Sequence, residues 1–230
     1  MLPRPPMWTK KNLGACIPCF AAGLTLLLAA CKPAGPKAFE DGQRLLEKGR
    51  PAEAAERLQV AAEIFRTNAT VWNYLGIARH QAGQSSNAVA AYNRALSINP
   101  DLMEARLNLG MLYLEVGQAG EARSAFTTYT LSRPHAPEGF ERLAESEMRM
   151  RDLPQAELHI RKALQLDDKS ADSWNTLGLI QIQRSRSREA AASFGVALVR
   201  QPDHPAAMLN LAIATQQLGD KAGALKLYRK

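Results

Sequence analysis

The sequence predicts an all-α protein, a solenoid of six stacked helix-turn-helix units. The first observation is a repeat of 34 residues that starts at Gly35 and runs to the end of the chain without insertion or deletion. The second is alanine at the twentieth position of all six units, and the third is Gly or Ala at the eighth. These two columns are Ala54, Ala88, Ala122, Ala156, Ala190 and Ala224, and Gly42, Gly76, Gly110, Ala144, Gly178 and Ala212.

Each unit is predicted to form two helices that pack against each other. Apolar residues at positions 4, 7 and 11 fall on one helical stripe, and those at 20, 24, 27 and 28 fall on a second stripe. Small residues at positions 8 and 20 allow the two backbones to approach where the helices cross. Glycine at position 15, as at Gly83, ends the first helix because it accepts a positive φ. Proline at position 32, as at Pro100, ends the second helix.

Two units carry the fullest pattern, a Trp-x-x-Leu-Gly start followed by Ala, an aromatic residue, Ala and Pro. The residues are Trp72, Leu75, Gly76, Ala88, Tyr92, Ala95 and Pro100 in one unit, and Trp174, Leu177, Gly178, Ala190, Phe194, Ala197 and Pro202 in the other. In this pattern the chain from residue 35 to residue 230 resembles the tetratricopeptide repeat family. The resemblance implies a right-handed solenoid with a concave inner face.

The repeat divides the chain into units that we number one to six. Unit one has Ala38 and Asp41 where the family has Trp and Leu, so we expect a degenerate cap with a wet outer face. Unit six stops at Lys230, inside its second helix, which favours a piece of a longer protein. The units cover residues 35–68, 69–102, 103–136, 137–170, 171–204 and 205–230.

The resemblance also implies a binding site, because first helices of this family line the concave face and hold a segment of a partner protein. Its middle is acidic here, so we expect a protein or peptide segment with basic and apolar residues. The alternative is an ordinary solvated helix face. The matching residues are Asn73 and Ile77 in unit two; Glu104, Leu107, Asn108 and Met111 in unit three; Glu138, Glu141, Arg142 and Glu145 in unit four; Asn175 and Leu179 in unit five; and Asn210 in unit six.

The first 30 residues are predicted to form a targeting segment, with basic residues before an apolar run from Leu13 to Ala30. The stretch 28–31, Leu-Ala-Ala-Cys, resembles a bacterial lipoprotein signal. The resemblance implies cleavage before Cys31, acylation of its thiol, and a new acylated amino terminus. Cys16 and Cys19 would be removed with the signal peptide. The alternative is an uncleaved membrane anchor, since the run has about the 18 residues that a span requires.

Residues 31–36 are predicted to form a lipid-anchored spacer that cannot become helical, because Pro33 and Pro36 interrupt it. Several acyl chains on Cys31 would attach the protein stably, since one chain alone binds a bilayer only weakly. Lys32 follows the cysteine where inner-membrane lipoproteins often carry Asp. By that rule of the family, the protein is expected in the bacterial cell envelope, on the periplasmic face of the outer membrane.

We find no pattern of catalytic residues after the signal segment. The four histidines are far apart, no cysteine follows Cys31, and no phosphate-binding loop or G-x-S-x-G is present. We therefore expect no enzyme activity, no cofactor and no metal. Without Arg4, Lys10 and Lys11 the 29 basic residues fall to 26, against 22 acidic ones. These are spread over the units, so no nucleic acid is expected; the cluster at Arg184, Arg186 and Arg188 is predicted to be a solvated turn.

The resulting hypothesis is a non-enzymatic adaptor or scaffold that binds other proteins at a membrane surface. Lipoproteins of similar layout assist assembly of pilus secretins and other envelope complexes. Two alternatives remain: the array is the substrate-recruiting arm of a larger enzyme, such as a glycosyltransferase, whose catalytic domain lies beyond residue 230, or it self-associates into a scaffold.

Overall fold

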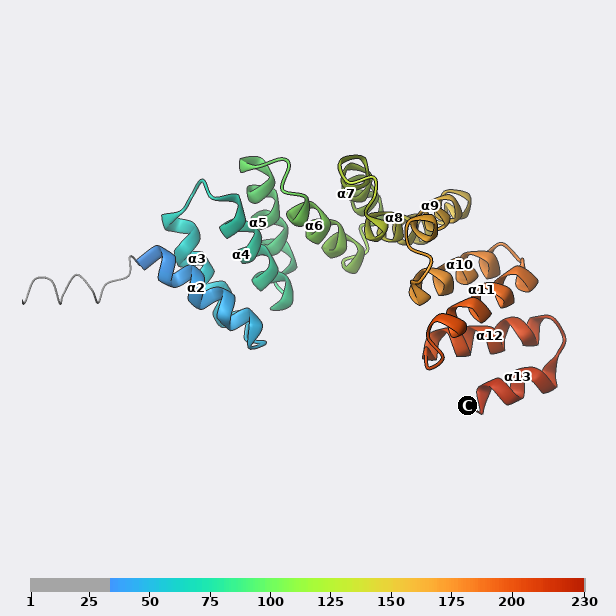
Figure 1. Cartoon of the computed structure of the whole chain (residues 1–230). Coiled ribbons are helices and arrows are strands. Elements are labelled where there is room, and N and C mark those ends of the chain that lie inside the picture. The colour runs from blue at the N-terminus through green and yellow to red at the C-terminus, as the bar shows by residue number, and fades with distance from the viewer. Residues whose placement is uncertain (1–33, 230) are drawn as a thin grey trace, which may run out of the picture.

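The computed structural model describes residues 34–229, which form twelve α-helices in six antiparallel pairs and contain no strand. The all-α solenoid is confirmed (Figure 1). The first helices of the pairs are α2 (Ala34–Glu47), α4 (Ala69–Gln81), α6 (Met103–Glu115), α8 (Pro137–Arg149), α10 (Ala171–Gln183) and α12 (Pro205–Gln217). The second helices are α3 (Pro51–Ile64), α5 (Ser85–Ile98), α7 (Ala119–Ser132), α9 (Leu153–Leu166), α11 (Ser187–Arg200) and α13 (Lys221–Tyr228).

One backbone conformation ends the first helix of every pair. At position 15 the chain adopts a positive φ, between 60° and 91°. Four units place glycine there, as the sequence predicts, whereas Arg151 and Ser185 adopt the same conformation without glycine. The turn geometry therefore belongs to the helix pair, and these two residues accept a left-handed backbone that L-amino acids disfavour.

The small residue at position 8 supports the side chain at position 24. A Cβ atom built on Gly110 would lie 2.5 Å from Cε1 of Phe126, so the ring rests directly on the glycine backbone. Gly76 meets Tyr92 in the same way. In unit four, position 8 is Ala144 and the partner is the slimmer Ile160, and both are fully buried. The two columns are thus matched in volume, as a close-packed core requires.

The pattern of helix contacts curves the array. Each first helix touches the next first helix, from α2 against α4 to α10 against α12. Among residues 34–229 no second helix touches another second helix. The first helices therefore lie closer together and form the inner face, while the second helices spread over the outer face. Figure 1 shows the resulting arch, from α2 at one end to α13 at the other.

The expectation of a non-helical spacer is wrong for its last three residues. Helix α2 begins at Ala34, so Gly35 and Pro36 lie in its first turn. Proline is accepted there because the first N–H groups of a helix have no intrahelical partner. Cys31, Lys32 and Pro33 lie outside the described residues.

In unit one, the surface that the other units bury against a preceding unit is exposed to solvent. Positions 3 and 10 of units two to six are buried against the preceding unit, as at Val71 and Ala78. In unit one these positions hold Lys37 and Arg44, which are exposed. Arg44 pairs with Asp41 at 2.6 Å on this surface. No helix between residues 34 and 229 combines the length and apolarity that crossing a membrane would demand.

Candidate partner-binding groove

Residues predicted to bind a partner line three pockets on the inner face of the described helices. A pocket of about 500 Å³ lies between α4 and α6 and includes Asn73, Ile77 and Leu107. A neighbouring pocket of about 440 Å³ includes Met111. A third, of about 460 Å³, lies between α8 and α10. Predicted residues that line them are Asn73, Ile77, Glu104, Leu107 and Asn108 in the first; Ile77, Asn108 and Met111 in the second; and Glu141, Arg142, Glu145 and Leu179 in the third.

The asparagines of the groove bind one another. Nδ2 of Asn108 donates to Oδ1 of Asn73 over 3.3 Å, and Nδ2 of Asn210 donates to Oδ1 of Asn175 over 2.9 Å. Asn73 and Asn175 are buried. The Oδ1 atoms of Asn73 and Asn175 therefore join neighbouring units. Asn175 and Asn210 line none of the three pockets.

These bonds follow a simple register along the inner face. The two asparagine pairs are each 35 residues apart, so a residue at one position meets the following position in the next unit. His80 bonds Glu115 across 2.8 Å at the same separation. A guanidinium N–H of Arg149 donates to the backbone oxygen of Leu114 with this spacing too. The repeat period of the sequence is the signal that could have found these pairs.

The two glutamates in the middle of the groove have partners within the fold. Glu145 pairs with Arg142 at 3.0 Å and with Arg149 at 2.9 Å. Glu141 accepts hydrogen bonds from the hydroxyls of Ser170 and Ser173 at the start of α10. The predicted preference for basic residues is thus weakened, because these carboxylates already have partners within the fold.

Two further carboxylates of the predicted set bind residues of α7 or of its C-terminal end. Glu104 pairs with Arg133 at 2.7 Å, although both side chains are about half exposed. Glu138 accepts a hydrogen bond from the hydroxyl of Tyr129 and lines none of the three pockets. Burial and the Glu138 carboxylate together raise the pKa of Tyr129 to about 12.

Further residues line the α8–α10 pocket beside those in the predicted set above. Asp172, Ser173, Thr176 and Met148 all contribute to it. The carboxylate-bearing side chain of Asp172 is 90% exposed, so it can meet a cation of a partner. Thr176 and Met148 occupy positions 6 and 12, which the family pattern already contains. The signal was present, and it was missed because these residue types are common on helix surfaces.

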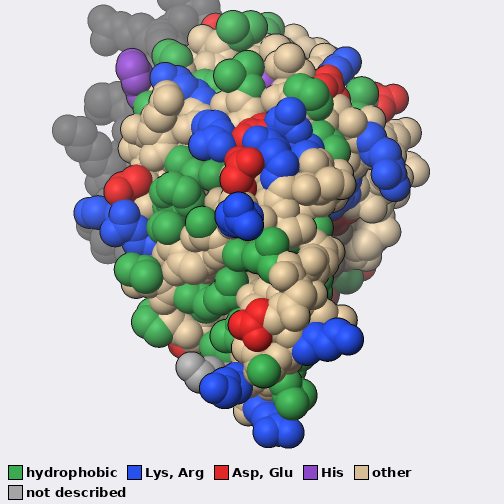
Figure 2. Space-filling model, turned by 90° about the vertical axis from the view of Figure 1, so that its right-hand side faces the viewer, with side chains coloured by type: hydrophobic (Ala, Val, Ile, Leu, Met, Phe, Trp, Pro, Cys, Tyr) green, Lys and Arg blue, Asp and Glu red, His purple; other side chains and the backbone are tan. Residues whose placement is uncertain are grey.

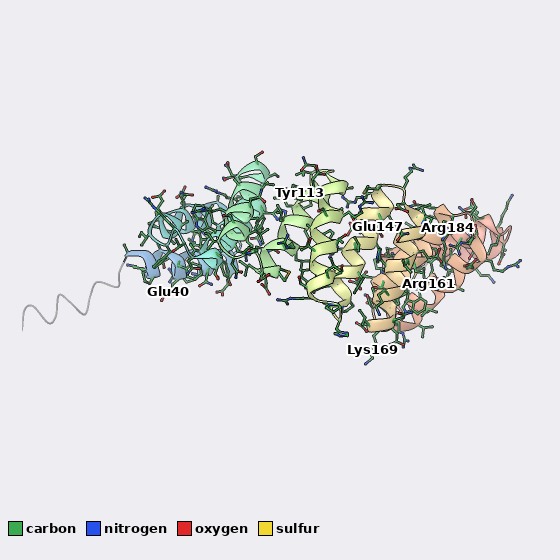
Figure 3. The ribbon with its side chains drawn as sticks, turned by 90° about the horizontal axis from the view of Figure 1, so that it is seen from above. Glu40, Tyr113, Glu147, Arg161, Lys169 and Arg184 are labelled. Atoms are coloured by element: carbon green, nitrogen blue, oxygen red, sulfur yellow. The ribbon has the colours of Figure 1, made fainter. Side chains whose placement is uncertain are left out.

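The arginine cluster of unit five is not simply a solvated turn. Arg184 and Arg186 both bind the buried carboxylate of Glu157, and Arg161 approaches it at 2.9 Å. Figure 3 shows Arg161 and Arg184 in the same part of the array. Burial alone would raise the pKa of Glu157, but the hydrogen bonds from Arg161 and Arg186 outweigh it and hold the pKa below 4.5. Figure 2 shows Lys and Arg interspersed with acidic and apolar side chains at this end of the array, without a field of one sign.

Three of the four histidines bind carboxylates. His80 binds Glu115, and Nδ1 of His159 lies 2.8 Å from Glu147, which is buried. His204 is buried, caps α12 through Ala207, and lies 3.1 Å from Asp172. Within residues 34–229 no three potential metal-binding side chains come together.

The fold and the groove define a tetratricopeptide repeat array, a class that serves typically as a non-catalytic module for protein interaction. Residues 25–230 match the family model described as the Cilia and flagella-associated protein 70 C-terminal domain, so the chain belongs to this family. No catalytic family is indicated.

Other proteins are similar to this chain in sequence or in structure. FlbA of Caulobacter vibrioides is 30% identical over 154 residues, 67% of this chain and 26% of FlbA. PilF of Pseudomonas aeruginosa has a TM-score of 0.71 at 17% identity, over 84% of this chain and 88% of PilF. YrrB, a tetratricopeptide repeat protein described as having an unusual peptide-binding site, has a TM-score of 0.61 at 18% identity, over 75% of this chain and 89% of YrrB. These structural similarities show the fold alone.

The chain spans only part of the curated proteins that it matches. It covers between 13% and 36% of the lengths of three such relatives. The activities of those whole proteins are therefore not assigned to this chain.

Proposed function

We propose that this protein is a non-enzymatic adaptor that holds a segment of another protein in its concave groove. In this proposal it is a lipoprotein of the bacterial cell envelope, attached through Cys31 to the periplasmic face of the outer membrane. It would assist assembly of an envelope complex such as a pilus secretin. The resemblance of the sequence around Cys31 to a lipoprotein signal supports this placement.

The observation that carries the proposal is the row of three pockets on the inner face. The α4–α6 pocket is lined by Ile77, Leu102 and Leu107, so it suits an apolar side chain of the partner. The α8–α10 pocket offers exposed charge of both signs, at Asp172 and Arg142. A segment with an apolar anchor followed by charged or polar residues fits this order. The description of YrrB shows that an array of this fold can bind a peptide.

Partner capture from native membranes tests the groove. The double substitution Leu107→Gln and Leu179→Gln removes apolar contacts from two pockets, and we expect crosslinked capture to fall about ten-fold, as loss of interface anchors does. The matched control is Leu158→Gln with Val199→Gln, whose side chains are highly exposed on second helices. We expect less than about a two-fold effect from this pair. Thermal melts of both variants verify that the fold is retained.

Equal loss of capture in the two double variants would contradict the groove. The membrane anchor needs a separate test, because the groove and the anchor are independent features. We expect the product to incorporate labelled palmitate, and expect the Cys31→Ser variant to lose both the label and membrane attachment. An unlabelled wild-type product that keeps Met1 would refute lipidation.

A further inference from the structure

The described part of the chain begins next to the C-terminal end of α3. A Cβ atom built on Gly35 would lie 2.8 Å from the ring of Phe65 and 3.0 Å from Cγ2 of Ile64. The first turn of α2 therefore touches the last residues of α3. In the full sequence Cys31 precedes Ala34 by three residues. Since consecutive Cα atoms are about 3.8 Å apart, the Cα atoms of Cys31 and Ala34 are at most about 11 Å apart.

Exposed apolar side chains lie at this same place. Val60 is 43% exposed and Ile64 is 51% exposed, and both project from one side of α3 because they are four residues apart. The next three units carry Arg94, Thr128 and Lys162 at the position of Val60. Unit five, however, carries Val196 at the position of Val60, and units two and four carry Ile98 and Leu166 at the position of Ile64. What sets the surface of unit one apart is that it lies next to the first turn of α2.

The surface continues into a shallow pocket at the edge between units one and two. This pocket, of about 590 Å³, is lined by Ile64, Phe65 and Ile98 and also by polar residues, Thr67, Asn68, Thr70 and Asn99. The nearby charges are mixed. Lys37 and Arg66 are exposed, and so is Glu63, whose carboxylate accepts a hydrogen bond from Gln59. Because charges of both signs are present, this surface does not favour a strongly anionic partner.

We propose that this surface, made by Val60, Ile64 and Phe65, rests on the phospholipid bilayer when the protein is anchored through Cys31. The inference depends on the proposed lipidation, which would fix the bilayer within a short, three-residue reach of α2. At that distance, some surface of unit one must face the lipid headgroups. Exposed Val60 and Ile64 are suited to the boundary between headgroups and acyl chains, and Lys37 and Arg66 can reach the phosphates.

The occupant is a zwitterionic or weakly anionic phospholipid surface, held mainly by the tether and by apolar contact. Contact of this kind depends little on salt, unlike binding through a basic patch. In this proposal unit one contacts the lipid directly.

Fluorescent probes at single cysteines test the contact. In the proposed mature protein Cys31 is acylated and Cys16 and Cys19 are removed, so an introduced cysteine is the only free thiol. The lipidated protein carrying Ile64→Cys or Val199→Cys is labelled with an environment-sensitive dye. It is then reconstituted in vesicles of phosphatidylethanolamine and phosphatidylglycerol. Val199 is the matched control because it is 78% exposed on α11, in unit five.

We expect the probe at position 64 to shift its emission to the blue and to be quenched by spin-labelled lipid, at low and at high salt. The probe at position 199 should be quenched only by aqueous iodide. Palmitate labelling of the same samples separates the two proposals. A labelled, vesicle-bound protein whose probe at position 64 remains in water overturns the contact and leaves the anchor intact. Lipid quenching at both positions overturns it as well, because the array would then lie flat. An unlabelled protein overturns both.

Discussion

In units two, three and five the aromatic ring at position 24 packs against the backbone of the glycine at position 8, and this contact explains the glycine there. In unit five the ring of Phe194 lies against Gly178. One added methyl group has no space there, because the neighbouring atoms belong to a buried ring rather than to a flexible chain end. The alanine column at position 20 is likewise fully buried in units one to five.

We predict that Gly178→Ala destabilises the protein by about 1–3 kcal/mol, the usual cost of overpacking a core. Gly195→Ala is the matched control, one residue after Phe194 in helix α11 and with no atom within 4 Å of its added Cβ. The control should raise stability by about 0.5–1 kcal/mol through helix propensity. Urea unfolding measures both, and the same sign for the two variants would refute the packing argument.

A second prediction concerns the left-handed residue Arg151, which has a φ of 62°. Arg151→Gly should raise the free energy of unfolding by about 1 kcal/mol, because glycine accepts this conformation without a Cβ clash. Arg151→Ala removes the same charged group but retains the Cβ, so it should not stabilise. Equal stabilities of the glycine and alanine variants would show that backbone strain at this position is negligible.

Helices of neighbouring units are held together by buried polar contacts as well as by apolar packing. Glu157 of α9 is the centre of one such contact, since it binds Arg161 on its own helix and Arg184 and Arg186 in the turn before α11. The hydrogen bond to Glu157 also raises the pKa of the Arg186 guanidinium. Removing the carboxylate would leave the arginines without their shared partner.

We expect Glu157→Gln to cost about 2–3 kcal/mol at neutral pH, the range for lost hydrogen bonds to charged groups. The pKa of Glu157 is lowered by folding, so its contribution is present above the unfolded pKa of about 4.5 and is lost as the pH falls through the folded value. The stability difference between wild type and variant should therefore shrink on acidification below that pH.

Urea unfolding between pH 7 and pH 3 measures this difference. Glu189→Gln is the control, because Glu189 pairs only with Arg186 among the described residues and is half exposed. It should change stability by less than about 0.5 kcal/mol. A Glu157→Gln penalty that is independent of pH would contradict the ionised contact.

The whole array gains its stability from contacts between neighbouring units, so its ends should differ from its middle. Helix α13 touches only α12 among the described helices, and Ala224 is its only buried residue. Leu225 and Tyr228 are about half exposed. The ring of Tyr228 therefore does not reach the buried state of its counterparts Tyr92 and Phe194.

We predict that backbone amides of α13 exchange with deuterium faster than those of α6 to α9, which have neighbours on both sides. Hydrogen exchange followed by mass spectrometry measures this gradient. Uniform protection from α2 to α13 would mean that the array unfolds as one unit, contrary to a chain of nearest-neighbour interfaces.

The repeat period predicts most of the architecture, because helix pairs, turns and buried columns all follow from local spacing. The site was harder to predict. Family positions located the inner face, but the partners of Glu141 and Glu145 depend on side-chain geometry between units. The Asn73–Asn108 hydrogen bond could have been predicted from the repeat, because contacts between residues 35 positions apart recur along the inner face. The helical start at Ala34 was missed because proline was treated as a breaker rather than as a residue of the first turn.

The central claim is that the partner segment lies along the inner face formed by the first helices. A photocrosslinking amino acid placed at Leu107, Leu179 or Val199 in the membrane-bound protein tests it most directly. The account predicts that the two groove positions crosslink to the same partner and that the outer position, Val199, does not. Crosslinking of that partner from Val199 alone, with none from Leu107 or Leu179, would contradict it.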